Sequence, residues 1–261
     1  MNVVSLGAVA YLNARPLVYG LDAHPEFSLR FDVPSRCAAL LHEGAIDVGL
    51  IPSIEYLRGA RMRIVPDLAI ASRGLVASVA IFTKKSIRDV RSIALDTSSR
   101  TSVALVSVLC ARAFNITPAF IAEPPDVGAM LARADAALVI GDIALFQQPM
   151  PGVEKIDLGA EWFALTGLPF VYAFWAGRPG ALQQQHVRAL QDARDKGAAR
   201  PDEIAAACYP EASSQRTVAA AYLRDNIKYS LGEDERAGLE LLYRYAAEAG
   251  VVAAARQVEF Y

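Results

Sequence analysis

The sequence predicts an α/β fold built on largely parallel sheets with helices on their faces. Three observations predict it: short apolar runs alternate with helical patterns along all 261 residues, several of these runs end in small polar residues, and the chain contains no internal repeat or long linker. The β–α–β alternation is typical of parallel sheets covered by helices. Without a flexible linker, any domain boundary has to be a crossing of strands.

The first part of the chain follows this alternation. We expect strands over Val3–Leu6, Phe27–Val33 and Ile46–Ile51. Between the last two strands, Ser35 suits the N-cap of a helix and Gly44 suits the position just after its last turn.

The middle of the chain repeats the alternation. Further strands are expected over Leu75–Phe82, Ile93–Leu95, Ala136–Ile140 and Val171–Trp175. A polar connector over 97–102 leads into an apolar stretch, Val103–Phe114, whose length and composition predict a buried helix.

The last third is helical in pattern. We expect helices over Leu182–Lys196 and Pro201–Cys208, a third from Ser213 to Tyr229, and a last one from Glu233 to about Gly250. The acidic start of the last helix complements the positive end of its dipole.

Composition and charge exclude several classes of protein. The formal net charge is −2 and 54% of the residues are hydrophobic, so we expect neither a nucleic-acid partner nor a disordered chain. The longest uncharged run, Trp162–Gly177, is too short for a membrane span and contains Gly167 and Pro169. No basic residue precedes the Ala8-Val9-Ala10 triplet, so we expect no signal peptide. The three cysteines are widely spaced and odd in number, so we expect reduced thiols in a cytoplasmic protein.

Several familiar catalytic patterns are absent from the sequence. There is no P-loop, no dinucleotide-binding glycine pattern after the first strand and no G-x-S-x-G elbow. The three histidines lie far apart and the three cysteines form no C-x-x-C pair, so we expect no metal and no cofactor. An enzyme of this composition would act by binding, orientation and hydrogen bonding.

Small polar residues cluster where the predicted strands end, and these are the candidate ligand contacts. They are Asn13, Ser35, Ser53, the 98–102 segment, and Gly141 with Asp142. Ligands of open α/β sheets bind at the carboxyl ends of the strands, where helix N-termini attract anions. Two such sites facing one another would suit a dicarboxylate. Each residue also has a purely structural interpretation: Ser35 and Asp142 as helix caps, and Asn13 as a turn residue.

Eight segments carry a resemblance to a known family. In order they are GAVAYLNARPL at 7–17, DVPSRCA at 32–38, DVGLIPSIEY at 47–56, LDTSSRTS at 95–102, LVIGD at 138–142, DLGAEW at 157–162, TGLPFV at 166–171 and YLRDNI at 222–227. Together they resemble the chorismate dehydratase family of the futalosine-dependent menaquinone pathway. The resemblance spans nearly the whole chain.

This resemblance implies a two-lobed, type II periplasmic-binding-protein-like fold with the ligand cleft between the lobes. Lobe one would comprise residues 1–74 and 177–261, and lobe two would be the insert, 75–176. By resemblance, Asn13, Ser35 and Ser53 face the cleft from lobe one. The lobe-two residues that face it would be Ser99, Thr101, Ser102, Gly141 and Asp142.

The implied activity is that of a hydro-lyase, which removes water from chorismate to give 3-[(1-carboxyvinyl)oxy]benzoate. Asn13 is the expected catalytic residue, orienting the leaving hydroxyl or a substrate carboxylate that acts as the base. Asp142 is the alternative base, and the serines, Thr101 and Gly141 would bind substrate. The expected partner is this small molecule alone, and the sequence does not predict the oligomeric state.

Three other functions compete with this one. A sibling enzyme of the same fold, 1,4-dihydroxy-6-naphthoate synthase, would carry an Ile-His-Glu type turn where this chain has Ile140-Gly141-Asp142. A non-catalytic small-carboxylate-binding protein of a transporter would need a signal peptide or lipobox. An effector-sensing domain would need a DNA-binding helix pair before the first strand.

Overall fold

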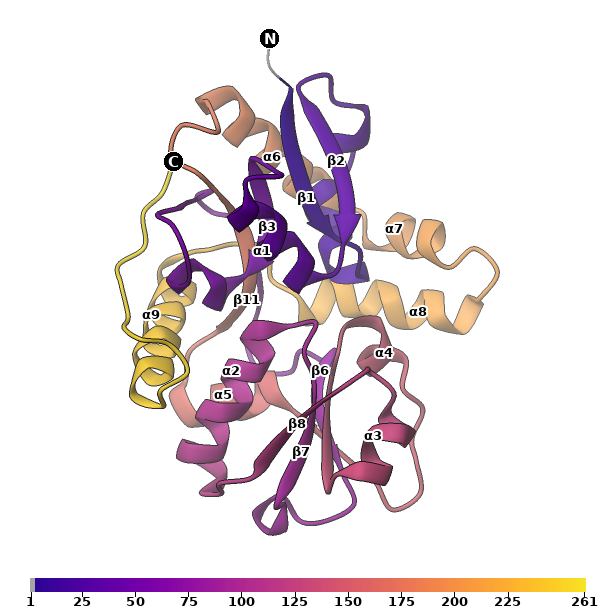
Figure 1. Cartoon of the computed structure of the whole chain (residues 1–261). Helices are drawn as coiled ribbons and strands as arrows, with labels where there is room; N and C mark the ends of the chain where they lie inside the picture. The colour runs from indigo at the N-terminus through magenta and orange to yellow at the C-terminus, as the bar shows by residue number, and fades with distance from the viewer. Residues whose placement is uncertain (1–2) are drawn as a thin grey trace.

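The computed structural model describes residues 3–261 and places them around two β-sheets (Figure 1). The first sheet has the order β2-β1-β3-β11-β4, and β5 also pairs with β11. Its strands are β1 (Val4–Val9), β2 (Phe27–Asp32), β3 (Val48–Pro52), β4 (Arg63–Ile64), β5 (Ile70–Ser72) and β11 (Phe170–Gly177). β1 runs parallel to β2 and β3, whereas β11 is antiparallel to β3, β4 and β5.

The second sheet has the order β10-β6-β9-β7-β8. Its strands are β6 (Val79–Thr83), β7 (Ser92–Asp96), β8 (Ala119–Glu123), β9 (Ala136–Ile140) and β10 (Glu154–Asp157). β7 is parallel to β8 and β9, while β6 is antiparallel to β9 and β10. The α/β class is therefore confirmed. Both sheets are mixed, because β6 and β11 run antiparallel to the strands beside them.

Helices flank both sheets (Figure 1). With the first sheet are α1 (Pro34–Glu43), α6 (Gln184–Ala198), α7 (Pro201–Cys208), α8 (Ser213–Ala221) and α9 (Glu233–Glu248). With the second are α2 (Arg100–Leu109), α3 (Val127–Arg133), α4 (Gly141–Phe146) and α5 (Leu158–Thr166). π-turns over Cys110–Phe114 and Tyr222–Asn226 extend α2 and α8, and short 3₁₀ turns include η1 (Leu12–Val18), η2 (Leu21–Ala23), η3 (Ser53–Leu57) and η4 (Ile87–Asp89).

Two helix starts differ from the prediction. The N-cap of α1 is Val33, not Ser35, because Pro34 occupies the first helical position, where a missing N–H costs nothing. The predicted left-handed Gly44 after this helix is confirmed, with φ of 73°. The second helix begins at Arg100, three residues before the predicted Val103, because Ser99 caps it by accepting the Ser102 N–H.

The chain crosses between the sheets twice, after β5 and before β11. At the first crossing Ala77 has the left-handed φ of 65°, and the Asp157 carboxylate accepts the N–H groups of Val76 and Ala77 at 3.1 and 2.6 Å. The predicted lobe limits near residues 75 and 176 stay a prediction. Strand pairing puts the whole of β11 in the first sheet.

One apolar cluster joins the two sheets and fixes their relation. It runs from Leu6 and Leu50 in the first sheet through Trp175 to Ile81 and Leu138 in the second. Strands β3, β6, β9 and β11 are buried along their whole length, which explains their continuous apolar sequences. Within residues 3–261, no helix has the length and apolar character needed to cross a membrane.

Candidate active site

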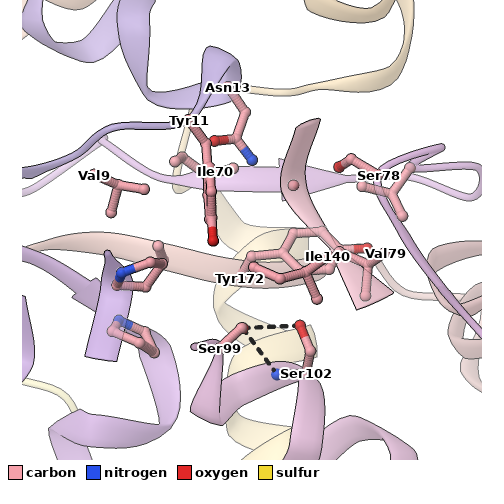
Figure 2. A pocket seen from close by; sticks show the side chains of 15 residues that line it. Val9, Tyr11, Asn13, Ile70, Ser78, Val79, Ser99, Ser102, Ile140 and Tyr172 are labelled. Carbon is pink, nitrogen blue, oxygen red and sulfur yellow. Dashed lines mark hydrogen bonds between the residues drawn. The ribbon is translucent and has the colours of Figure 1, made fainter. Parts of the chain in front are cut away.

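A small pocket, with a cavity volume of about 40 Å³, lies between the two sheets. Figure 2 shows Tyr11 and Asn13 approaching it from one side and Ser99 and Ser102 from the other. The lining residues are Val9, Tyr11, Asn13, Pro34, Pro52, Ile70, Val76, Ser78, Val79, Ser99, Ser102, Ile140, Gly141, Tyr172 and Ala173. No side chain among these described residues carries a formal charge. Hydroxyls, one amide and backbone groups supply its polarity.

The ends of four strands build this pocket. β1 ends at Val9 and leads to the η1 turn, which carries Asn13, and β3 ends at Pro52. From the second sheet, β7 leads to Ser99 at the start of α2, and β9 leads to Gly141 at the start of α4. Helix N-termini therefore face the pocket, and their free N–H groups favour an anionic ligand.

Gly141 can be explained by its contact with Tyr11. Its φ is 65°, a conformation that side chains rarely adopt, and a Cβ there would lie 3.1 Å from the Tyr11 ring. Burial raises the pKa of the Tyr11 phenol, while a hydrogen bond with the Ser98 hydroxyl at 3.3 Å opposes that rise. Glycine thus lets the ring pack directly on the backbone at the start of α4.

The Asn13 amide has an unused hydrogen-bonding atom. Its Oδ1 is buried and has no hydrogen-bond partner among the described residues. A buried acceptor without a partner costs free energy, and because Asn13 lines the pocket, a bound ligand could donate a hydrogen bond to this oxygen. The structure therefore leaves Asn13 available for the predicted contact.

Ser78 and Tyr222 are polar groups of this site that the sequence reasoning missed. Their hydroxyls lie 2.7 Å apart, and Ser78 lines the pocket. Burial raises the pKa of Tyr222, and hydrogen bonds from Ser78 and Asn13 oppose the rise. The available signal was a single serine within the apolar run Leu75–Phe82.

Ser99 and Ser102, both predicted substrate contacts, do line the pocket. Their hydroxyl oxygens are 2.9 Å apart, and Ser99 Oγ also accepts the Ser102 N–H at 3.3 Å (Figure 2). The cap and the pocket lining are therefore the same side chains, so the structural and the functional interpretations of this turn are compatible.

Thr101 and Ser53 lie outside the pocket lining and contact each other between η3, which follows the first-sheet strand β3, and α2, which follows the second-sheet strand β7. Both are fully buried, with their hydroxyl oxygens 3.4 Å apart. Thr101 Oγ1 accepts the Ile54 N–H at 3.2 Å, and Ser53 donates to Val171 O at 2.7 Å. Their role as substrate contacts stays a prediction, and the hydrogen bonds they make are internal to the protein.

The Asp142 side chain and the Ser35 backbone also make contacts between the first-sheet and second-sheet parts of the chain. Asp142 Oδ1 accepts the Leu12 N–H at 3.1 Å, and Oδ2 accepts the Tyr209 hydroxyl at 3.4 Å. Burial raises the pKa of Asp142, with these two hydrogen bonds opposing it. The Ser35 N–H donates to Ser98 O at 3.0 Å, and its side chain belongs to a separate outer hollow with Ser98 and Glu123.

The predicted site residues therefore divide into two groups. The pocket lining contains Asn13, Ser99, Ser102 and Gly141, whereas Ser35, Ser53, Thr101 and Asp142 make contacts beside it. Across residues 3–261, no cluster of three or more His, Cys, Asp or Glu side chains is arranged to hold a metal ion. The pocket can bind an anion by hydrogen bonds and orient a hydroxyl, but its own side chains offer no strong base.

Sequence similarity connects this site with menaquinone biosynthesis. A family model described as menaquinone biosynthesis matches residues 4–248. The chain is 33% identical over 263 residues to the chorismate dehydratase of Thermus thermophilus, covering 92% of this chain and 94% of that protein. A chorismate dehydratase of Campylobacter jejuni is 32% identical over 163 residues, covering 62% of this chain and 58% of that protein.

Solved structures confirm the predicted fold. A protein from Archaeoglobus fulgidus superposes with a TM-score of 0.79 at 18% identity, covering 95% of this chain and 98% of that one. A Candida albicans protein, described as having the generic periplasmic-binding-protein fold, gives 0.65 at 12% identity, covering 98% and 92%. The aliphatic sulphonate binding protein SsuA of Escherichia coli also gives 0.65, at 17% identity, covering 98% and 95%.

Proposed function

The chain belongs to the menaquinone biosynthesis family, and from this we propose that it is a chorismate dehydratase. The observation that carries the proposal is its near full-length similarity to a chorismate dehydratase. The lining of the pocket supports it, because helix N-termini and hydroxyls can donate hydrogen bonds to an anion. In this proposal the protein is a cytoplasmic hydro-lyase whose partner is its small-molecule substrate.

The proposed reaction removes water from chorismate and leaves an aromatic ring. A proton leaves the ring carbon that bears the enolpyruvyl ether, and hydroxide leaves the neighbouring carbon. The electron pair of the broken C–H bond completes the ring, giving 3-[(1-carboxyvinyl)oxy]benzoate and water. Because aromatisation supplies the driving force, the protein has to bind two carboxylates, orient the C–H bond and stabilise the leaving oxygen.

Asn13 is the proposed catalytic residue. Its amide can donate a hydrogen bond to the departing oxygen while its unpaired Oδ1 accepts one from the substrate. An amide is too weak a base to take the proton, and among the described residues the pocket lining has no carboxylate, imidazole or amine. A substrate carboxylate is therefore the proposed base.

The hydrogen bonds of Asp142 support the proposal that a substrate carboxylate, and not Asp142, is the base. Its two carboxylate oxygens already accept hydrogen bonds from Leu12 and Tyr209. A carboxylate used in this way holds the turn that carries Asn13 against α4. Asp142 is proposed as a positioning residue, with the role of base left to the substrate.

The test is incubation of the purified protein with chorismate, followed by ultraviolet absorbance and mass spectrometry. We expect a product lighter by one water, formed without added metal or nucleotide and unaffected by EDTA. Stoichiometric binding of chorismate without turnover would instead indicate a binding protein. No binding at all would refute the assignment.

A further inference from the structure

A buried carboxylate beside the pocket is surrounded by three basic side chains. Glu55, in η3, is only 1% exposed. Its Oε1 lies 3.0 Å from Arg58 Nη1, and its Oε2 lies 2.8 Å from Arg100 Nη1 and 3.2 Å from His42 Nε2. None of these side chains lines the pocket, so the proposed chemistry leaves the cluster unexplained.

The three basic groups come from different lobes. His42 and Arg58 lie in α1 and just after η3, on the same side as Glu55. Arg100 is the first residue of α2, on the other side, and directly follows the cap residue Ser99. The Glu55–Arg100 ion pair therefore connects the lobes at the helix start that lines the pocket.

A second contact holds the same helical turn. Thr101, the next residue of α2, accepts the Ile54 N–H and lies against Ser53. Consecutive residues of η3 thus contact consecutive residues of α2. Both contacts break if the lobes separate, whereas the ion pairs of Glu55 with His42 and Arg58 stay within one lobe.

From this arrangement we infer that Glu55 and Arg100 form a latch between the lobes that holds the start of α2 closed over the pocket. Both act as positioning residues, because the latch keeps Ser99 and Ser102 facing Asn13. Arg58 and His42 hold the Glu55 carboxylate in place within its own lobe, so Oε2 is positioned to pair with the Arg100 guanidinium when the lobes close. Its importance for turnover rests on the proposed function, but its effect on closure does not.

Arg100 is the suitable residue to change. Its side chain is 39% exposed, and its loss leaves Glu55 with two basic partners, so the fold is expected to survive Arg100→Gln. Loss of Glu55 would instead leave Arg58 and Arg100 together without their shared carboxylate. Arg100→Lys keeps the charge and serves as the rescue variant. Arg133→Gln removes an ion pair with Glu123 inside lobe two and is the matched control.

Hydrogen exchange of three backbone amides reports closure without any ligand. The N–H groups of Leu12, Ser35 and Ile54 each donate to an acceptor on the opposite lobe. Such amides exchange only when the lobes separate, so their rates follow the open population. Amides of the β1–β2 ladder remain bonded in either state and act as internal references.

The experiment compares exchange, Tm and chorismate kinetics across these variants. We expect Arg100→Gln to speed exchange at all three amides about tenfold and to lower Tm by a few degrees, because the closed form loses the corresponding free energy, and Arg100→Lys to recover part of the protection. The control should match the parent protein. Acceleration confined to Ile54, or none at the three amides, would refute the latch, even if Tm fell and the β1–β2 ladder exchanged faster.

Turnover provides an independent readout. If the protein dehydrates chorismate, Arg100→Gln should raise KM by much less than the exchange effect, because a tenfold rise of a minor open form leaves most molecules closed. If it does not, the proposed function fails, while the three amides still decide whether the latch exists.

Discussion

The substitution Thr101→Val tests whether Thr101 holds η3 against α2 or instead contacts the substrate. Valine keeps the shape of threonine but removes Oγ1, which accepts the Ile54 N–H at 3.2 Å. Thr101 is fully buried, so the Ile54 N–H loses its partner in a place that water does not reach while the lobes are closed. Leaving a buried donor unpaired costs about 1–3 kcal/mol.

Little of this cost can be recovered from Ser53. Its hydroxyl already donates to Val171 O at 2.7 Å, so it keeps its main hydrogen bond when Thr101 Oγ1 is removed. Each kcal/mol corresponds to roughly 2–4 °C in Tm for a chain of this size. We therefore expect Thr101→Val to lower Tm by several degrees and to speed exchange of the Ile54 amide.

Calorimetry and amide exchange measured on the same preparation check this expectation. Thr101→Ser keeps the hydroxyl and should remain close to the parent protein in both measurements. If Thr101→Val instead keeps its Tm and the protection of Ile54 but binds chorismate more weakly, Thr101 contacts the ligand directly. That result would refute the reasoning from the structure.

Three further predictions concern Asn13, Asp142 and the motion of the lobes. Asn13→Ala should lower kcat by a factor on the order of 10²–10³ with less effect on KM. Its Tm should fall slightly, because the amide loses its hydrogen bond with Tyr222, whereas Oδ1 has no partner among the described residues; a normal kcat in steady-state kinetics would make Asn13 a turn residue. Burial raises the pKa of Asp142 above 3.8, against the opposing effects of Leu12, Tyr209 and Arg15, so protonation favours the folded state. The stability from this group is present at acid pH and is lost as pH rises through the raised pKa. As pH rises through that window, the Tm of Asp142→Asn should rise relative to the Tm of the parent protein, and below the ordinary carboxyl pKa the two should have similar Tm values. The variant should keep substantial activity; an inactive but folded variant would make Asp142 the base. Because the latch keeps the free protein mainly closed, small-angle scattering should show nearly the same radius of gyration with and without the dicarboxylate product, and a clearly smaller radius with product bound would show that the free protein is mainly open.

The sequence predicted most strands with continuous apolar cores, and also the edge strand β2, but it missed β4, β5, β8 and β10. Strands such as β3, β9 and β11 are buried throughout, and their composition is distinctive. β8 at one edge of the second sheet is largely exposed, and β10 at the other carries Glu154, Lys155 and Asp157. Such strands are defined by pairing with distant segments, and a local pattern does not reveal that pairing.

The sequence predicted that the candidate site lies at a set of strand ends, but it did not predict which residues there line the pocket and which make contacts within the protein. Asn13, Ser99 and Ser102 line the pocket, yet Thr101, between two of these, contacts the other lobe. Which neighbours face the pocket depends on how α2 is turned against η3, and spacing alone does not fix that. The sequence did not indicate Ser78 as a site residue, because it lies inside an apolar run and its partner Tyr222 is far away in the sequence.

The most direct test of the central claim is a single-turnover reaction of excess protein with chorismate, comparing the parent chain with Asn13→Ala. The proposal predicts that the parent converts chorismate to 3-[(1-carboxyvinyl)oxy]benzoate, and that Asn13→Ala binds chorismate but converts it about 10²–10³ times more slowly. Equal rates for the two proteins, or binding by the parent without any aromatic product, would contradict the account.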